Sequence, residues 1–183
     1  MSLPVAMNRA HLAPLPHDRS VGIGCIGAGF IMADCHLVAY LAAGLKPVAI
    51  FAPRRAAAEE VAARHGIPTV HADWRALVED LAVEVVDVAV PPDIQPEIIE
   101  GICALVERKE ARVRGILAQK PLAGDFPTAA RLVRRCREAG IRLVVNQNMR
   151  YDHAVRACGD LLARGVLGAP VLATIEMLSL IHI

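Results

Sequence analysis

One lysine in this chain stands where an ammonium group could take part in a reaction. Lys120 follows Gln119 and the apolar stretch 113–118, at a position where a strand would end. An ammonium group there can donate a hydrogen bond to a substrate hydroxyl or polarise a carbonyl. A surface lysine needs no such explanation, but lysine is rare here: Lys46 and Lys109 are the only others among 20 lysines and arginines. Position and rarity together favour a catalytic role for Lys120.

Two glycines separate an apolar strand from a helix early in the chain. Gly27 and Gly29 follow the β-branched stretch 21–26, and an amphipathic helix is expected over 30–43. In such a unit the first glycine makes the turn, and the second lets the backbone approach a pyrophosphate at the helix N-terminus. Met32 stands at the third position of this fingerprint and predicts a slightly wider approach of helix to strand. A tight turn before a core helix would look similar. The predicted cofactor contacts here are Gly27, Gly29, Phe30 and Ile31.

The end of the second expected strand carries arginines where an NAD enzyme usually carries an acid. Residues 51–55 read Phe-Ala-Pro-Arg-Arg, so no carboxylate is available for a ribose 2′-hydroxyl. The guanidinium groups of Arg54 and Arg55 suit a 2′-phosphate. Alternatively, the two residues begin a solvated helix. The pattern favours NADP over NAD and makes both arginines candidate cofactor contacts.

The loop after the apolar run 85–90 is rich in proline. Pro91, Pro92 and Asp93 are expected to stop a strand and cap the next helix. Because this loop follows a strand, Pro91, Pro92 and Gln95 are also candidate cofactor contacts. Gln119 and Lys120, at the end of another expected strand, are candidate cofactor contacts for the same reason.

A second polar loop runs from Asn146 to Tyr151. Its hydrogen-bonding side chains predict a site-lining role for some members, with Asn148 and Arg150 as candidates, unless the loop only caps a helix. His36, alone on the first helix, is interpreted as a packing or capping residue. No spacing of His, Cys or acidic residues indicates a metal site, and no G-x-S-x-G elbow indicates a hydrolase.

Strands and helices alternate along the chain. The expected strands cover 21–26, 46–51, a short segment at Val70, 85–90, 113–118, 142–145 and 171–177. The expected helices cover 30–43, 56–65, a segment capped by Asp73, 96–108, a segment capped by Asp125 and running to 139, and 151–164. This alternation predicts an α/β fold with a doubly wound parallel sheet. The loops named above then meet at the carboxyl edge of the sheet, where such folds bind ligands.

Composition narrows the classes of partner. The chain has 183 residues, of which 55% are hydrophobic, and a net charge of +1. A sizeable core is therefore available, and neither nucleic acid nor a membrane is expected as a partner. The five cysteines form no C-x-x-C pair, so buried free thiols in a reducing cytoplasm are expected. Residues 1–20 hold three prolines and no long apolar run, which indicates a disordered lead-in rather than a signal peptide.

Taken together, the motifs resemble the Gfo/Idh/MocA oxidoreductases, the family of glucose–fructose oxidoreductase and inositol dehydrogenase. The resemblance covers about 21–177. It is carried by an ordered series of segments: Gly27-Ala28-Gly29-Phe30-Ile31 with His36 following, 88–92, 119–123, 148–151 and 165–168.

The resemblance implies a Rossmann domain that binds NAD(P), expected at 21–150, and the start of a second α/β domain, expected at 151–183. It implies hydride transfer between nicotinamide and a sugar, cyclitol or related alcohol, and we expect a full-length chain to form homo-oligomers. Lys120 matches the family's Glu-Lys-Pro lysine beside substrate and nicotinamide. The chain departs from the family at Gln119, where glutamate is usual, at Gln95, where histidine is common, and at Ala52, where NAD users carry an acid.

The last six residues, 178–183, do not continue the family pattern and match a reading frame of a sequencing adapter. We therefore hypothesise a truncated reading frame, and a chain that binds cofactor without turnover. The resemblance also leaves open a nucleotide-binding regulator or redox sensor that keeps the Rossmann domain. The substrate-side Lys120 favours the enzyme.

Overall fold

The computed structural model describes residues 15–174. The chain divides into two compact units, and the described residues fall into 15–147 and 148–174. The first unit carries the sheet and its helices, and the second carries one helix. Of the expected lead-in at 1–20, residues 15–20 are exposed and have no regular secondary structure, and the rest lie outside the described residues.

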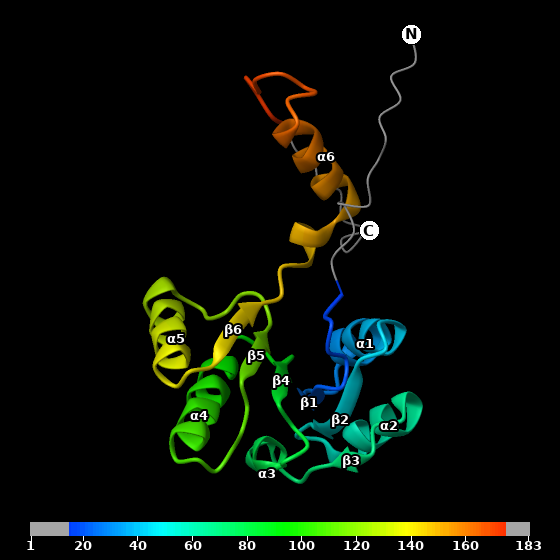
Figure 1. The fold of residues 1–183 in the computed structure, drawn as a ribbon. Helices are drawn as coiled ribbons and strands as arrows, with labels where there is room; N and C mark the ends of the chain where they lie inside the picture. Colours follow the sequence, from blue (N-terminus) through cyan, green and yellow to red (C-terminus); the bar gives the residue numbers. More distant parts are fainter. Residues whose placement is uncertain (1–14, 175–183) are drawn as a thin grey trace. The chain divides into compact units, whose positions relative to one another are not determined.

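A six-stranded sheet forms the centre of the first unit (Figure 1). Its strands are β1 (Gly22–Ile26), β2 (Lys46–Phe51), β3 (Thr69–Val70), β4 (Val85–Val88), β5 (Gly115–Ala118) and β6 (Arg142–Val145). They are ordered β3-β2-β1-β4-β5-β6, and every neighbouring pair is parallel. The predicted doubly wound parallel sheet is therefore confirmed. The order reverses between β1 and β4, where a crevice opens at the carboxyl ends of the strands in folds of this kind.

The helices follow the strands as the sequence predicts, with small shifts at their ends. In the first unit they are α1 (Leu37–Ala42), α2 (Arg55–His65), α3 (Trp74–Glu79), α4 (Gln95–Glu107) and α5 (Phe126–Glu138). Asp73 and Asp125 accept hydrogen bonds from backbone N–H groups of the first turns of α3 and α5, as expected of N-caps. Gly66 ends α2 in the left-handed conformation with φ of +69°.

The first helix differs from the expectation in its opening turns. A π-helical segment, η2 (Ile31–His36), precedes α1, and the N–H of Leu37 bonds to the carbonyl of Met32, five residues earlier. Met32 is completely buried in the core beneath this segment. The π-helical segment therefore accommodates a long side chain where the fingerprint has glycine. The wider approach of helix to strand stays a prediction.

Two hydrophobic cores lie on the two faces of the sheet. One packs η2, α1 and α2 against residues such as Cys25 and Ile50. The other packs α3, α4 and α5 against residues such as Val86 and Ile116. Successive side chains of a strand point to opposite faces, so β1 and β2 supply both cores: Ile26 and Ala49 lie in one, and Cys25 and Ile50 in the other. The aliphatic strand sequences are those of a sheet buried on both sides.

Two loop predictions need correction. The strand expected over 85–90 ends at Val88, and Asp93 does not cap α4, whose N-cap is Ile94 with no side-chain hydrogen bond.

The cysteines are not all buried: Cys35 and Cys158 are exposed, whereas Cys25, Cys103 and Cys136 are buried free thiols. Burial raises the pKa of Cys25 well above its usual value.

The second unit begins with a 3₁₀ turn, η3 (Asn148–Tyr151), followed by α6 (His153–Ala163), which Asp152 caps. The expected strand at 171–177 does not form over its described residues, 171–174, where Val171 and Leu172 are exposed. A strand needs a neighbour for its backbone hydrogen bonds, and this unit offers none within 148–174. Residues 175–177 and the tail 178–183 lie outside the described residues. Across the described chain, no helix has the length and apolarity needed to cross a bilayer.

Candidate functional site

Three neighbouring cavities lie along the carboxyl edge of the sheet, two between the segments after β1 and β4, where the strand order reverses, and one between the segments after β1 and β2. Their volumes are about 300, 370 and 210 Å³. Gly29 lines all three. The largest reaches Trp74 and Glu97, the second Gln119 and Lys120, and the smallest Arg54. The turn after β1 therefore stands where three recesses meet.

The two glycines of this turn meet different surroundings. Gly27 has φ of +113°, a conformation that disfavours any side chain, and its N–H bonds to the Phe51 carbonyl. An added Cβ at Gly27 would lie 2.4 Å from the carbonyl oxygen of Ala89. An added Cβ at Gly29 would meet no atom within 4 Å. Gly27 is therefore needed by the fold, whereas Gly29 leaves an open cradle in front of the helix N-terminus.

That helix N-terminus is suited to an anion. The first backbone N–H groups of a helix lack intrahelical partners and carry the positive end of its dipole. The nearby acidic side chain, Asp34, forms an ion pair with Arg64 at 2.9 Å, which offsets its charge. The residues present thus fit a pyrophosphate, the group for which the sequence predicts this turn.

The sequence allowed two interpretations of the arginines after β2, a contact to a 2′-phosphate or a solvated helix start. The structure favours the first for Arg54 and the second for Arg55. Arg54 lines the smallest cavity together with Ala52, Pro53 and the Gly29 turn, and its side chain has no hydrogen bond or ion pair within the described residues. Arg55 bonds to Glu59 one turn along α2, at 2.8 Å, and does not line that cavity. Arg54 is therefore the guanidinium available to a phosphate, while Arg55 is a solvated helix residue.

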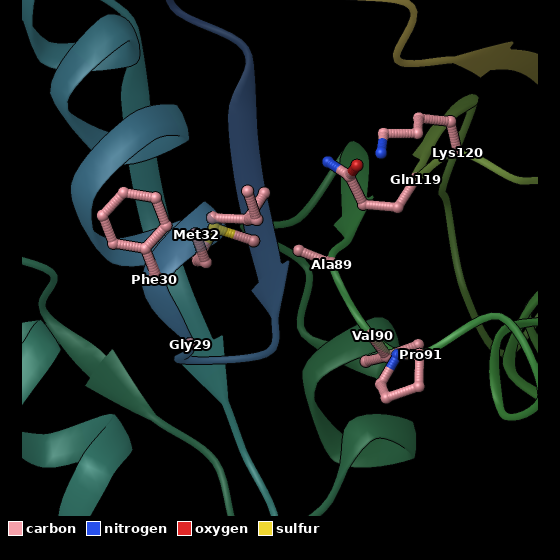
Figure 2. Close-up of a pocket in the computed structure, with 9 residues that line it drawn as sticks. Gly29, Phe30, Met32, Ala89, Val90, Pro91, Gln119 and Lys120 are labelled. Atoms are coloured by element: carbon pink, nitrogen blue, oxygen red, sulfur yellow. The ribbon is translucent and has the colours of Figure 1, made fainter. Parts of the chain in front are cut away.

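The cavity beside Lys120 joins two parts of the chain (Figure 2). The turn after β1 supplies Gly29, Phe30, Ile31 and Met32, and the loops after β4 and β5 supply Ala89, Val90, Pro91, Gln119 and Lys120. In Figure 2 the nitrogen atoms of Gln119 and Lys120 point across the cavity, toward the side of Phe30 and Met32. Lys120 is exposed and precedes a cis peptide bond to Pro121.

The side chain of Gln95 fixes the loop that carries Lys120 through hydrogen bonds to its backbone. Its side chain has no exposed surface. Its Nε2 donates to the carbonyls of Gln119, Pro121 and Leu122 at 2.9–3.2 Å, and its Oε1 accepts from the Gln119 N–H at 2.7 Å. The predicted direct cofactor contact from Gln95 is corrected accordingly, because a fully buried and fully engaged amide acts on a ligand only through the loop that it positions.

His36 is the centre of a buried hydrogen-bond network. Its Nδ1 lies 2.6 Å from Oδ2 of Asp87, and its Nε2 lies 2.9 Å from Gln119 Nε2 and 2.7 Å from Asn146 Nδ2. Tyr40 donates its hydroxyl to the same Asp87 oxygen at 2.6 Å. Burial, with the Asp87 charge as a second cause, raises the pKa of Tyr40 well above its usual range, so its hydroxyl stays a donor.

The sequence gives His36 a packing or capping role and does not single out Asp87. Asp87 could have been found from the sequence, because it is an acidic residue inside the apolar strand Val85–Val88, where both of its neighbours are buried. Burying a carboxylate costs stability unless partners compensate it. An acid at such a position therefore predicts a hydrogen-bond partner on the adjoining helix.

Trp74 is a further residue that the sequence did not assign to the site. It lines the largest cavity with Pro53, Ile94 and Ile98, and the Arg75 guanidinium lies 4.3 Å from the centroid of its ring. An added Cβ at Gly101 of α4 would lie 2.2 Å from the Trp74 ring, so the indole needs a glycine opposite it. The walls of this cavity are mostly apolar and suit a flat heteroaromatic ring.

The remaining candidates are two prolines after β4 and two residues of the second unit. Pro92 is exposed and lines none of the three, whereas Pro91 lines the two larger ones. Asn148 and Arg150 are exposed on η3 in the second unit. The described residues contain no group of three or more His, Cys, Asp or Glu side chains placed to hold a metal ion.

Comparison with known proteins places this geometry among nicotinamide enzymes. Residues 21–147 match a family described as an oxidoreductase family with an NAD-binding Rossmann fold. Levoglucosan dehydrogenase of Pseudarthrobacter phenanthrenivorans is 28% identical over 159 residues, which are 82% of this chain and 39% of that protein.

Two solved structures share the fold. An NAD binding oxidoreductase from Klebsiella pneumoniae is 29% identical with a TM-score of 0.71, over 84% of this chain and 41% of that one. A 3-ketoreductase from Actinomadura kijaniata, solved with TDP-benzene and NADP, is 29% identical with a TM-score of 0.68, over 80% of this chain and 44% of that one. The chain thus spans less than half the length of these relatives.

Proposed function

Because the chain belongs to this oxidoreductase family with its NAD-binding Rossmann fold, we propose that it is the cofactor-binding half of an enzyme that transfers hydride between a nicotinamide cofactor and a sugar, cyclitol or related alcohol. The observation that carries the proposal is the position of Gly29, where an added Cβ would enter open space shared by three cavities. A dinucleotide has two ring systems joined by a pyrophosphate, and this arrangement offers two recesses beside a cradle for anions.

NADP is the cofactor that the residues favour. Arg54 lines the small cavity, its side chain has no partner within the part of the chain that the structure describes, and Ala52 provides no carboxylate to accept from a 2′-hydroxyl. A guanidinium group donates two parallel hydrogen bonds to a phosphate and compensates its charge. The 3-ketoreductase of similar fold was solved with NADP, which is compatible with this preference.

Lys120 is the residue that we assign to catalysis. The bound nicotinamide would supply or accept the hydride, while the protein positions the alcohol or carbonyl against it. Lys120 lines the cavity opposite Phe30 and Met32, so Nζ donates a hydrogen bond to the substrate oxygen and stabilises negative charge that develops there. Phe30, Ile31 and Pro91 supply apolar walls of this cavity.

The substrate class rests on the relatives. One acts on levoglucosan and another is a 3-ketoreductase, which supports a polyhydroxylated substrate for this protein. Asn148 and Arg150, the domain boundaries at 20/21 and 150/151, and homo-oligomer formation by a full-length protein stay predictions.

Titration of the chain with NADP and NAD tests the proposal. Trp74 is the only tryptophan and lines the largest cavity, so saturable quenching of its fluorescence is expected, with the tighter curve for NADP. Calorimetry on the same samples gives the affinities independently. Absence of saturable binding of either cofactor to the folded chain would refute the proposed function, and equal or tighter NAD binding would refute the NADP preference alone.

A further inference from the structure

A continuous series of side-chain contacts connects the buried carboxylate of Asp87 with the residue before Lys120. Asp87 on β4 contacts His36 on η2, and His36 contacts Gln119 at the end of β5 and Asn146 at the end of β6. Four elements of the first unit meet at one imidazole ring. The side chain of His36 is 9% exposed and that of Asp87 1%, so these contacts form with little competition from water.

The partners of His36 determine where its proton lies. A side-chain amide nitrogen donates hydrogen bonds and accepts none. Two amide nitrogens face Nε2 of His36, at 2.9 and 2.7 Å, so Nε2 must be the unprotonated acceptor. The proton then lies on Nδ1 and is donated to Asp87 Oδ2 at 2.6 Å. The ring of His36 thus lies between the carboxyl group of Asp87 and two side-chain amides.

The carboxylate is retained at a cost to the fold. Oδ1 of Asp87 is buried and has no hydrogen-bond partner among residues 15–174, where Tyr40 and His36 both contact Oδ2. An unsatisfied buried oxygen destabilises a fold, and native proteins hold few of them. A purely structural strand residue would be apolar here, like Val86 and Val88 on either side.

The network acts on the loop that carries the catalytic lysine. Gln95 holds the backbone of Gln119 from one side, and His36 holds its side chain from the other. Lys120 is the next residue and has a long, exposed, flexible stem. The position of its Nζ therefore depends on how firmly the preceding residue is held. We propose that His36 is a positioning residue for Lys120, acting through Gln119, and that Asp87 fixes the ring tautomer that this role requires. The proposal rests on the catalytic role of Lys120 given above.

The small number of lysines makes the proposal testable by NMR without a substrate. Reductive methylation with ¹³C keeps the charge of each amine and labels Lys46, Lys109, Lys120 and the N-terminus. Lys120→Arg identifies the Lys120 signal.

Two variants break the network at different places. Asp87→Asn removes the carboxyl group, and Gln119→Ala removes the link to the loop while the contact between His36 and Asp87 stays intact. The matched control is Asp80→Asn, which alters another His–Asp contact, the half-buried one from His71 Nε2 to Asp80 Oδ2 at 3.0 Å, remote in sequence from the Lys120 loop.

Both network variants are expected to shift the Lys120 signal of the free protein while the Lys46 and Lys109 signals stay in place, and Asp80→Asn should leave all three unchanged. In ¹⁵N-histidine spectra of the parent chain, the signal lost in His36→Gln should show a proton on Nδ1 and none on Nε2. If Asp87→Asn does not fold, Gln119→Ala alone decides. An unshifted Lys120 signal in Gln119→Ala, or a proton on Nε2 of His36, would overturn the proposal. Because these spectra need no cofactor, failure of NADP to bind refutes the proposed function and leaves this test standing.

Discussion

Gly27 and Ala89 lie so close that a Cβ on the glycine would be 2.4 Å from the carbonyl oxygen of the alanine. This contact joins the turn after β1 to the segment after β4, at the point where the strand order reverses. Gly27 fits at this place because it has no side chain. Gly29, two residues later, faces open space. One glycine thus serves the fold, and the other leaves room for a ligand.

Gly29→Val is expected to abolish cofactor binding while the chain stays folded. The added side chain would occupy the space common to the three cavities, and no atom within 4 Å of its Cβ opposes it. The contrasting variant, Gly27→Ala, should lower the free energy of unfolding by about 2–4 kcal/mol, since it combines a positive φ with a backbone clash. Calorimetric titration and urea unfolding of both variants separate the two effects. Parent-like cofactor affinity in Gly29→Val would show that the phosphate site is elsewhere.

Arg54→Ala is expected to weaken NADP binding by roughly 10- to 100-fold, since a charge-assisted hydrogen bond contributes about 1.5–3 kcal/mol. NAD affinity should change little, because NAD lacks the 2′-phosphate. Arg55→Ala is the matched control: this side chain is engaged with Glu59, and its loss should affect neither cofactor. Equal losses for both cofactors, or a larger effect of Arg55→Ala on NADP, would contradict the assignment.

Gln95→Leu is expected to lower the free energy of unfolding by about 2–4 kcal/mol. Leucine has a similar size, but it leaves the carbonyls of Gln119, Pro121 and Leu122 and the N–H of Gln119 without this partner. Glu100→Gln on the same helix breaks an exposed ion pair with Arg131 and should cost less than about 1 kcal/mol. Denaturant unfolding measures both free energies. Similar losses in the two variants would contradict a stabilising role for the hydrogen bonds between Gln95 and the loop 119–122.

Asp80 should make stability depend on pH in the acid range. A hydrogen bond from the Ala82 N–H, together with the contact to His71, lowers the pKa of Asp80 below its ordinary value of 3.8. The unfolded chain therefore binds this proton at a higher pH than the folded chain does. The resulting stabilisation is fully present well above pH 3.8 and is lost as the pH falls through the lower, folded value.

The measurement is chemical unfolding of the parent chain and Asp80→Asn between pH 7 and pH 2. The variant is expected to be less stable by about 0.5–1 kcal/mol at pH 7, and the two curves should converge near pH 2. A difference that stays constant over this range would indicate that the Asp80 charge contributes nothing.

Much of the fold could be predicted because its signals are local. Apolar runs of four to six residues, glycine at helix ends and aspartate at Asp73 and Asp125 act over a few residues, so β2 and β6 were placed with the bounds that the structure has. The alternation of strands and helices then leaves a doubly wound parallel sheet as the way to bury both faces. It also places the loops after β1, β4 and β5 at one edge. The convergence of Gly29, Pro91 and Lys120 on one cavity follows from this topology.

Only the tertiary structure decided which side chain meets which partner. Arg54 and Arg55 are identical in type and adjacent in sequence, and they differ because one lines a cavity while the other lies on the Glu59 face of α2. Gln95 resembled a ligand contact, yet it is buried beneath a loop 24 to 27 residues further along the chain. His36 meets partners 51, 83 and 110 residues away. Such contacts depend on how strands and helices pack across the sheet, and no periodicity within a single segment records that packing.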